Sequence, residues 1–220
     1  YRTMLRHPGN TNLTIHYDAT FQGLPVMVDK GPFIQDYLAA LRLTLDRALA
    51  EYPRVLAFRV DLRLPVMTEL PDYAYTNKVI SLFLESFKAK IKHNRDMARR
   101  ANPYAHDSNV RYVWAREQGQ GGRPHYHLVI LLNQDAFYTL GKLSSEKVNM
   151  FHRLQAAWAS ALRLSVHEVS GLVQVPENAT YRFRRDAESY RELFKRASYL
   201  CKTATKVFGD GFHAFDTSRL

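Results

Sequence analysis

The chain has 220 residues, and its 46% hydrophobic and 24% charged side chains are typical of a soluble globular protein. No apolar run reaches the length of about 18 residues that a membrane-spanning helix needs, and the mean hydropathy of −0.35 also excludes one. The 31 lysines and arginines exceed the 21 aspartates and glutamates by 10, which favours a polyanionic partner, either nucleic acid or an acidic membrane surface.

No repeat, low-complexity tract or long Gly/Ser-rich linker divides the sequence. We therefore predict a single domain over residues 31–220, preceded by an N-terminal extension of unknown role over residues 1–30. The single cysteine, Cys201, excludes an internal disulfide and favours a reducing cytoplasm. No signal-like apolar segment opens the chain, which agrees with a cytoplasmic location.

Hydrophobic spacing and turn residues divide the predicted domain into helices and strands. In chain order these are a helix over residues 31–52, a strand over 54–64, a helix over 76–100, strands over 110–118 and 125–132, a helix over 144–161, a strand over 169–175 and a helix over 186–208. The Gly-rich segment 119–124 joins the second and third strands as a hairpin. Helices and strands alternate irregularly around this hairpin, so the predicted fold class is α+β with a mainly antiparallel sheet.

His125 and His127 are two residues apart on a predicted strand, so both side chains leave the same face. The Gly-rich turn returns Glu117, on the preceding strand, to the neighbourhood of this pair. Two imidazoles and a carboxylate on one face can bind a divalent cation and leave coordination positions open. This donor set favours Mg²⁺ or Mn²⁺, whereas a structural zinc site usually needs more thiolates than one cysteine provides. An isolated histidine pair is more often structural, and the carboxylate is what indicates a metal site.

If residues 186–208 form one helix, an apolar stripe that includes Leu193 and Leu200 faces the core. The opposite side would carry a tyrosine among three lysines, namely Lys195, Tyr199, Lys202 and Lys206. Tyr190 lies half a turn away from Tyr199 on such a helix and would pack on the apolar side. A phenol is a weak nucleophile until a cation or a base lowers its pKa, and Lys202 can supply that charge or steady a phosphate. Taken alone, Tyr199 is also compatible with an ordinary surface tyrosine.

Two segments of the chain resemble the motifs of HUH endonucleases that start rolling-circle replication. They are residues 122–130, in which Tyr126 stands between two histidines, and residues 199–202, a tyrosine with a lysine three positions later. Glu117 matches the acidic ligand that these initiators place on the preceding strand. The order of the motifs, metal site before tyrosine, is that of replication initiators rather than conjugative relaxases. More narrowly, the chain is similar to the replication proteins of filamentous phages (inoviruses) and their prophage relatives.

The resemblance implies an antiparallel sheet flanked by helices, similar to an RRM-like palm. It implies that Tyr199 attacks a phosphodiester of single-stranded or melted DNA at a replication origin, giving a 5′-phosphotyrosine and a free 3′-OH. Lys202 would assist this attack, and Glu117, His125 and His127 would hold the divalent metal. The reaction would initiate rolling-circle replication of a phage or plasmid in the cytoplasm of a bacterial host. A host helicase or polymerase is a possible partner, and the sequence does not decide whether one is recruited.

DNA recognition would rest on basic surfaces and on aromatic faces that stack unpaired bases. Residues 182–206 carry eight basic and three acidic side chains, which gives this segment a net charge of +5. The strand over residues 54–64 adds arginines on its polar face, next to Asp61. The candidate DNA contacts are Arg59, Arg63, Arg184, Arg185, Lys195, Arg196 and Lys206.

Two alternatives remain beside the endonuclease. A non-catalytic DNA-binding regulator of replication or transcription would share the charge and the fold, and only the five site residues distinguish it from an enzyme. A different phosphoryl-transfer enzyme fits the sequence less well, because a histidine-triad hydrolase needs a further histidine where Val129 stands.

Overall fold

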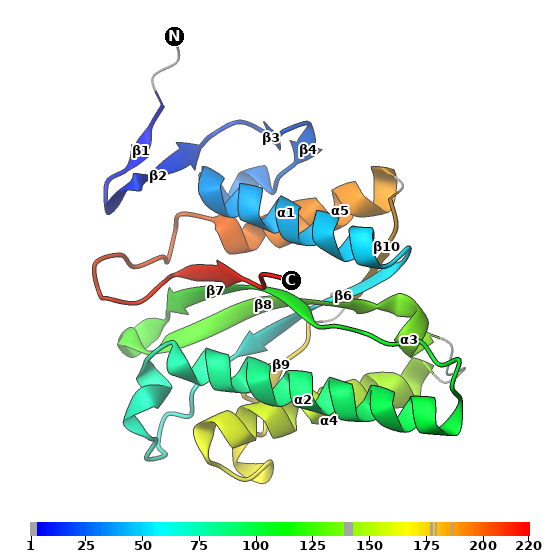
Figure 1. Ribbon diagram of the computed structural model, residues 1–220. Helices are drawn as coiled ribbons and strands as arrows, with labels where there is room; N and C mark the ends of the chain where they lie inside the picture. The colour runs from blue at the N-terminus through cyan, green and yellow to red at the C-terminus, as the bar shows by residue number, and fades with distance from the viewer. Residues whose placement is uncertain (1–3, 139–142, 177, 179, 186) are drawn as a thin grey trace.

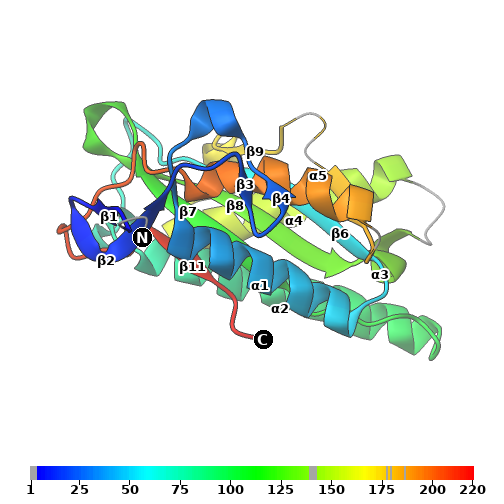
Figure 2. The same cartoon turned by 90° about the horizontal axis from the view of Figure 1, so that it is seen from above.

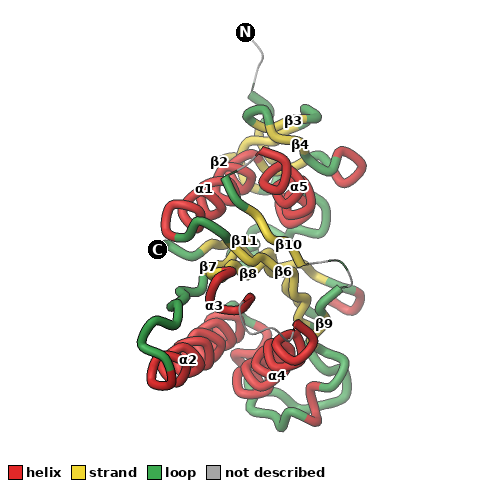
Figure 3. Tube along the Cα trace, turned by 90° about the vertical axis from the view of Figure 1, so that its right-hand side faces the viewer, coloured by secondary structure: helices red, strands yellow, loops and turns green. Residues whose placement is uncertain are grey.

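Three layers make up the fold, with one large sheet between two pairs of helices (Figure 1). The computed structural model describes residues 4–138, 143–176, 178, 180–185 and 187–220. One face of the sheet is covered by α1 (Gln35–Glu51) and α5 (Ala187–Ala197), and the other face by α2 (Lys78–Ala101) and α4 (Leu143–Leu162). Figure 3 shows these layers end-on, and Figure 2 shows α1 and α5 side by side above the strands.

Six strands form the central sheet, in the order β10-β6-β8-β7-β11, with β9 paired to the end of β6. Their bounds are β6 Val55–Leu62, β7 Arg111–Gln118, β8 Pro124–Asn133, β9 Val173–Gln174, β10 Thr180–Phe183 and β11 Phe215–Thr217. Every pairing between these described strands is antiparallel. The structure therefore confirms the predicted fold class, α+β with an antiparallel sheet flanked by helices. The central strand β8, followed by the short helix α3 (Gln134–Tyr138), is covered on both faces, which explains its unbroken apolar run Leu128–Leu132.

Two hydrophobic cores lie on the two faces of the sheet. The helix predicted from Thr76 begins two residues later, at Lys78, and the Thr76 hydroxyl oxygen accepts the Lys78 N–H at 3.2 Å. Its apolar side chains are buried against the sheet, namely Ile80, Phe83, Leu84, Phe87 and Ile91. None of the helices that the structure describes combines the length and the apolarity needed to cross a membrane.

Trp158 has the largest side chain among those fully buried. Its indole N–H donates to the backbone oxygen of Arg63 at 2.9 Å, and its ring meets Phe83 edge-on at 6.0 Å between centroids. The substitution Trp158→Ala should lower the free energy of unfolding by about 3–5 kcal/mol, because it leaves a cavity. Urea denaturation measures this loss. Tyr104→Ala is the control at a side chain that is 91% exposed, and an equal loss in both variants would contradict the place of Trp158 in the core.

The N-terminal residues form two small sheets on the outer side of α1 (Figure 1). They are a three-stranded sheet of β1 (Arg6–His7), β2 (Asn10–His16) and β5 (Phe33–Ile34), and a hairpin of β3 (Thr20–Phe21) and β4 (Leu24–Pro25). Phe21, Leu24 and Val26 are buried in the same core as α1 and α5. The segment predicted as an N-terminal extension thus supplies core side chains, and the domain boundary stays a prediction.

Two predicted elements begin four residues later in the structure. The first helix begins at Gln35 rather than at Gly31-Pro32, because Phe33 and Ile34 pair with β2 as a strand. The strand predicted over residues 169–175 is limited to β9, because a 3-10 turn at His167–Val169 precedes it.

The largest difference concerns the last helix, which was predicted over residues 186–208. α5 ends at Ala197, and the 3-10 turn η5 (Ser198–Cys201) follows it. The Ser198 hydroxyl donates to a backbone oxygen of the preceding turn and accepts the N–H of Met27 at 3.0 Å. Hydrogen bonds of this kind between a serine side chain and the backbone compete with the helix.

Beyond η5 the helix does not resume, because Lys202 has extended backbone and residues 203–205 form a bend and a turn. Lys202 forms a bridge with Phe33, and the Thr203 N–H donates to the backbone oxygen of Pro32 at 3.0 Å. The prediction of one continuous helix is therefore wrong. The residues after Ala197 form hydrogen bonds with residues about 170 positions earlier in the chain. Helical periodicity carries no information about contacts at that separation.

Candidate active site

The sheet register gathers four polar side chains at one end of the face that α1 and α5 cover. Glu117 in β7 lies directly opposite His125 in β8, so the hairpin brings Glu117 to the neighbourhood of the histidine pair, as predicted. His127, two residues further along β8, lies between Ala115 in β7 and Asp61 in β6. Because alternate residues of a strand share a face, the side chains of both histidines, Glu117 and Asp61 leave the sheet on the same side.

Glu117, His125 and His127 form a candidate metal site, as predicted. One donor atom from each of them lies within 4.8 Å of the others. Glu117 Oε2 is 3.1 Å from His127 Nε2 and 3.5 Å from His125 Nε2. Ligands bound at right angles, about 2.1 Å from one cation, stand about 3 Å apart, so these donors fit around a single divalent ion. Two nitrogens and one oxygen leave positions for water or for a phosphate oxygen.

Asp61 is a further member of the site, and the sequence alone predicts no role for it. Its Oδ1 lies 2.6 Å from His127 Nδ1. When Nε2 of His127 gives up its proton to bind a cation, Asp61 still accepts the N–H of Nδ1, and the lone pair is then on Nε2, the nitrogen that faces Glu117. Burial alone would lower the pKa of His127, but its hydrogen bonds to Asp61 and Glu117 raise it. Asp61 therefore fixes the ring of His127 in the orientation that metal binding requires.

Two lysines face the other oxygen of Glu117. Lys202 Nζ is 3.3 Å and Lys206 Nζ is 3.4 Å from Glu117 Oε1. Burial alone would raise the pKa of Glu117, but hydrogen bonds from His125 and His127 and the charge of Lys206 hold it well below its usual range. Burial lowers the pKa of Lys206, an effect that Glu117 partly offsets.

The predicted exposed position of Lys202 and Lys206 is wrong, because the helix ends before it reaches them. Both lysines are buried, and none of the Lys206 side chain is exposed. Lys206 therefore lies inside the site rather than on the outer surface where a DNA contact was expected.

Tyr199 in η5 is half-buried next to the candidate ligands. Its ring meets the His127 ring edge-on, with 5.6 Å between centroids. Two cations contact the same ring: Lys202 Nζ lies 3.9 Å and Arg59 Cζ lies 4.7 Å from its centroid. The structure thus brings the predicted nucleophile, the predicted lysine and the predicted ligands together.

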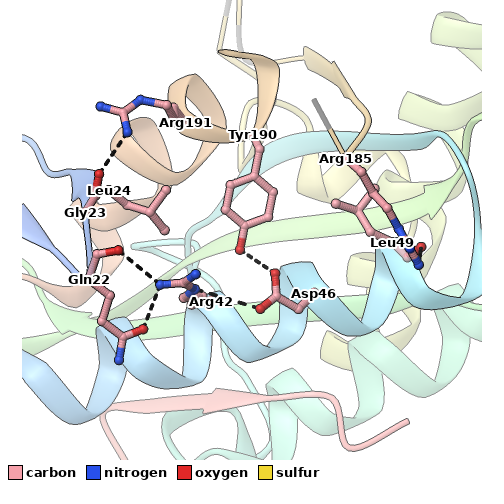
Figure 4. Close-up of a pocket in the computed structure, with 9 residues that line it drawn as sticks. All are labelled: Gln22, Gly23, Leu24, Arg42, Asp46, Leu49, Arg185, Tyr190 and Arg191. Carbon is pink, nitrogen blue, oxygen red and sulfur yellow. Dashed lines mark hydrogen bonds and ion pairs between the residues drawn. The ribbon is translucent and has the colours of Figure 1, made fainter. Parts of the chain in front are cut away.

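Tyr190 lies in a separate pocket of about 510 Å³ between α1 and α5 (Figure 4). Its hydroxyl donates to Asp46 Oδ1 at 2.6 Å, and its ring contacts Phe183. Burial, together with the bond to Asp46, raises the pKa of Tyr190. As predicted, Tyr190 packs against the core, and Tyr199 is the member of this pair whose ring meets that of His127.

The predicted DNA contacts occupy different parts of the surface. Arg59 lies in the site itself, with Nε 3.1 Å from Asp61 Oδ1. The exposed members of the set are Arg63, Arg184, Arg185, Lys195 and Arg196. Arg184 and Arg185 precede α5 and so lie at the opposite end of that helix from Tyr199. A DNA contact at each of these exposed residues stays a prediction.

The substitution Asp61→Asn should weaken Mn²⁺ binding about 10- to 100-fold, because the amide no longer fixes His127 as the carboxylate does. Calorimetric titration of the metal-free protein with MnCl₂ measures the change. Asp216→Asn, at a half-buried aspartate of the edge strand β11, is the control and should leave the affinity unchanged. Equal affinities in wild type and Asp61→Asn would show that Asp61 has no influence on the metal site.

Comparison with known proteins identifies the family. Among solved structures, the N-terminal nuclease domain of minute virus of mice non-structural protein 1 matches with a TM-score of 0.35 and 10% identity, over 83% of this chain and 90% of that one. Uncharacterized protein YfjJ of Escherichia coli (strain K12) is 32% identical over 200 residues, which cover 86% of this chain and 96% of YfjJ. Uncharacterized protein YagK of the same strain is 33% identical over 210 residues, which cover 91% of this chain and 98% of YagK. Residues 16–218 match the YagK/YfjJ C-terminal domain, and the chain therefore belongs to the YagK/YfjJ C-terminal domain family.

Proposed function

We propose that this protein is a metal-dependent endonuclease that nicks and rejoins single-stranded or melted DNA, with Tyr199 as its nucleophile. The observation that carries the proposal is the contact between Tyr199 and His127, 5.6 Å between ring centroids, at a group of three candidate ligands. Glu117, His125 and His127 would hold the divalent ion, Mg²⁺ or Mn²⁺, because their two nitrogens and one oxygen suit an ion that keeps open positions.

The charges around Tyr199 favour an anionic phosphodiester. Three cations contact two carboxylates there, namely Arg59, Lys202 and Lys206 against Asp61 and Glu117. A bound divalent ion would add to this positive excess and polarise a phosphate oxygen. Lys202 and Arg59, which lie against the ring of Tyr199, would stabilise the negative charge of the phosphate as the tyrosine oxygen attacks phosphorus.

In the nicking step, the Tyr199 oxygen attacks the phosphorus of one phosphodiester. A bond forms between this oxygen and phosphorus, and the bond from phosphorus to the 3′-oxygen breaks. The phenol loses one proton and the leaving 3′-oxygen gains one, so the products are a 5′-phosphotyrosine and a 3′-OH. The phosphotyrosine keeps the energy of the broken bond, and attack by a 3′-OH therefore rejoins the strand without a nucleotide cofactor.

We further propose that this chemistry initiates rolling-circle replication of a phage or plasmid. The free 3′-OH would prime a polymerase at the origin, and the covalent protein would hold the 5′ end until the strand is rejoined. Support comes from the resemblance of residues 122–130 and 199–202 to the two motifs of HUH replication initiators. The partner of the protein in this role is single-stranded or melted origin DNA, and the host replication machinery acts after the nick.

A covalent adduct is the readout that tests the endonuclease. The protein is incubated with a pool of single-stranded oligonucleotides that have randomised centres and a fluorescent 3′ label, with MnCl₂, MgCl₂ or EDTA. The label stays with the fragment whose 5′ end joins the tyrosine, so a shifted band on a denaturing gel reports the adduct. We expect the band with Mn²⁺ or Mg²⁺ and its loss in EDTA. Binding of the pool on a native gel without an adduct in either metal would contradict the proposal and support the non-catalytic regulator.

A further inference from the structure

A second cavity, of about 300 Å³, opens directly beside Tyr199. It lies between the strands β6, β8 and β10 and the helix α5 with its following turn, which contribute Arg59, Val129, Tyr181, Leu193, Arg196 and Tyr199 to its walls. Because Arg59 and Tyr199 belong both to this cavity and to the candidate active site, the two spaces adjoin.

The sheet register explains the position of the cavity. Along β8, His127 and Val129 leave the same face one step apart, and Val129 lies opposite Arg59 in the same way that His127 lies opposite Asp61. Tyr181 in β10 is paired with Ala57, one further step along β6. The cavity is therefore the next row of the same sheet face, immediately beyond the candidate metal site.

The walls combine apolar surfaces with polar groups at the edge. Val129 and Leu193 are buried and supply flat apolar contacts, and the half-buried ring of Tyr181 supplies an aromatic face. Arg196 lies on the rim, with 59% of its side chain exposed and its Nε 3.2 Å from Glu192. Arg59, Arg196 and Tyr181 all line the cavity, so two guanidinium groups and one phenol supply its polar groups.

We propose that this cavity binds the unpaired base of the nucleotide next to the scissile phosphate and thereby sets the sequence preference of nicking. The proposal rests on the proposed endonuclease function. A volume near the lower end of small-molecule sites suits one base rather than two. Apolar and aromatic walls stack a base, while phenol and guanidinium groups donate hydrogen bonds to its edge. The shared Arg59 and Tyr199 connect the base in the cavity to the phosphate at the nucleophile.

A binding experiment tests the cavity independently of catalysis. It uses the Tyr199→Phe variant, which cannot form an adduct, and a fluorescently labelled oligonucleotide selected for binding from the randomised pool, with an abasic site moved along its strand. We expect one abasic position to weaken binding about 5- to 150-fold, the range that loss of one base–aromatic stack produces. Adding Tyr181→Leu, which keeps apolar bulk but removes the aromatic face, should abolish the penalty at that position alone.

Sequencing of the adducts formed from the randomised pool gives the second arm. Tyr181→Leu and Arg196→Ala in otherwise wild-type protein should relax the preference at one position next to the nick, whereas Arg191→Ala, an exposed arginine on the same helix that lines the other pocket, should not. Arg196 is exposed, so its variant stays informative if Tyr181→Leu does not fold.

The outcomes separate the two proposals. Adducts with unchanged nick preference in both cavity variants would overturn the base site and leave the endonuclease intact. Failure of the wild-type protein to form an adduct would overturn the endonuclease. If one abasic position still weakens binding and Tyr181→Leu abolishes that effect, the base site in the cavity is supported. No penalty at any abasic position would overturn the base site as well.

Discussion

Replacing Tyr199 with phenylalanine is expected to reduce the covalent protein–DNA adduct by at least about a thousandfold, because only the phenolic oxygen can form the bond to phosphorus. Phenylalanine keeps the ring, so the contacts with His127, Lys202 and Arg59 remain and the site keeps its shape. Oligonucleotide affinity on native gels should therefore change little. The measurement is the adduct band on a denaturing gel, with wild-type protein in the same metal and DNA concentrations.

Tyr190→Phe is the matched control, because Tyr190 precedes Tyr199 on the same segment of chain but donates to Asp46 in a separate pocket. Loss of that hydrogen bond should cost about 1 kcal/mol of unfolding free energy and leave the adduct in place. An adduct that persists in Tyr199→Phe and disappears in Tyr190→Phe would identify Tyr190 as the nucleophile. An adduct that persists in both variants would exclude a tyrosine mechanism at either position.

The hairpin and its three candidate ligands could be predicted because the necessary information is local. Glu117 and His125 lie within one hairpin, whose Gly-rich turn fixes which residues are opposite each other. The two-residue period of a strand then places His127 on the same face. Asp61 could not be assigned in this way. Alternation in β6 gives the face of the sheet on which Asp61 lies. The residue opposite Asp61, however, depends on the pairing of β6 with β8, and α2 and β7 lie between these two strands in the sequence.

The end of the last helix could not be predicted either, because tertiary hydrogen bonds override helical periodicity there. The apolar spacing continues past Ala197, yet Ser198 and Lys202 pair with Met27 and Phe33. Tyr199 consequently reaches the candidate ligands on a 3-10 turn rather than on the exposed face of a helix. The same change of direction buries Lys206 against Glu117.

Removing any one candidate ligand is expected to weaken Mn²⁺ binding by more than the roughly 10- to 100-fold cost of losing an outer partner such as Asp61, and to reduce the adduct accordingly. His125→Ala is the variant that should disturb the rest of the site least, because the His125–Glu117 distance of 3.5 Å is longer than the His127–Glu117 distance of 3.1 Å. Calorimetry measures the affinity, with His213→Ala as the control at an exposed histidine. Unchanged affinity in His125→Ala, His127→Ala and Glu117→Ala would exclude this metal site.

Glu117→Ala should differ from the histidine variants because Glu117 also neutralises buried charge. Its removal leaves the ammonium group of Lys206 without a carboxylate, which should lower the free energy of unfolding by about 3–5 kcal/mol. The double variant Glu117→Ala/Lys206→Met removes that unpaired charge and should recover much of the stability, as urea denaturation would measure, but none of the Mn²⁺ affinity. Recovery of both properties would contradict the role of Glu117 as a ligand, and recovery of neither would show that the lysine is not the source of the instability.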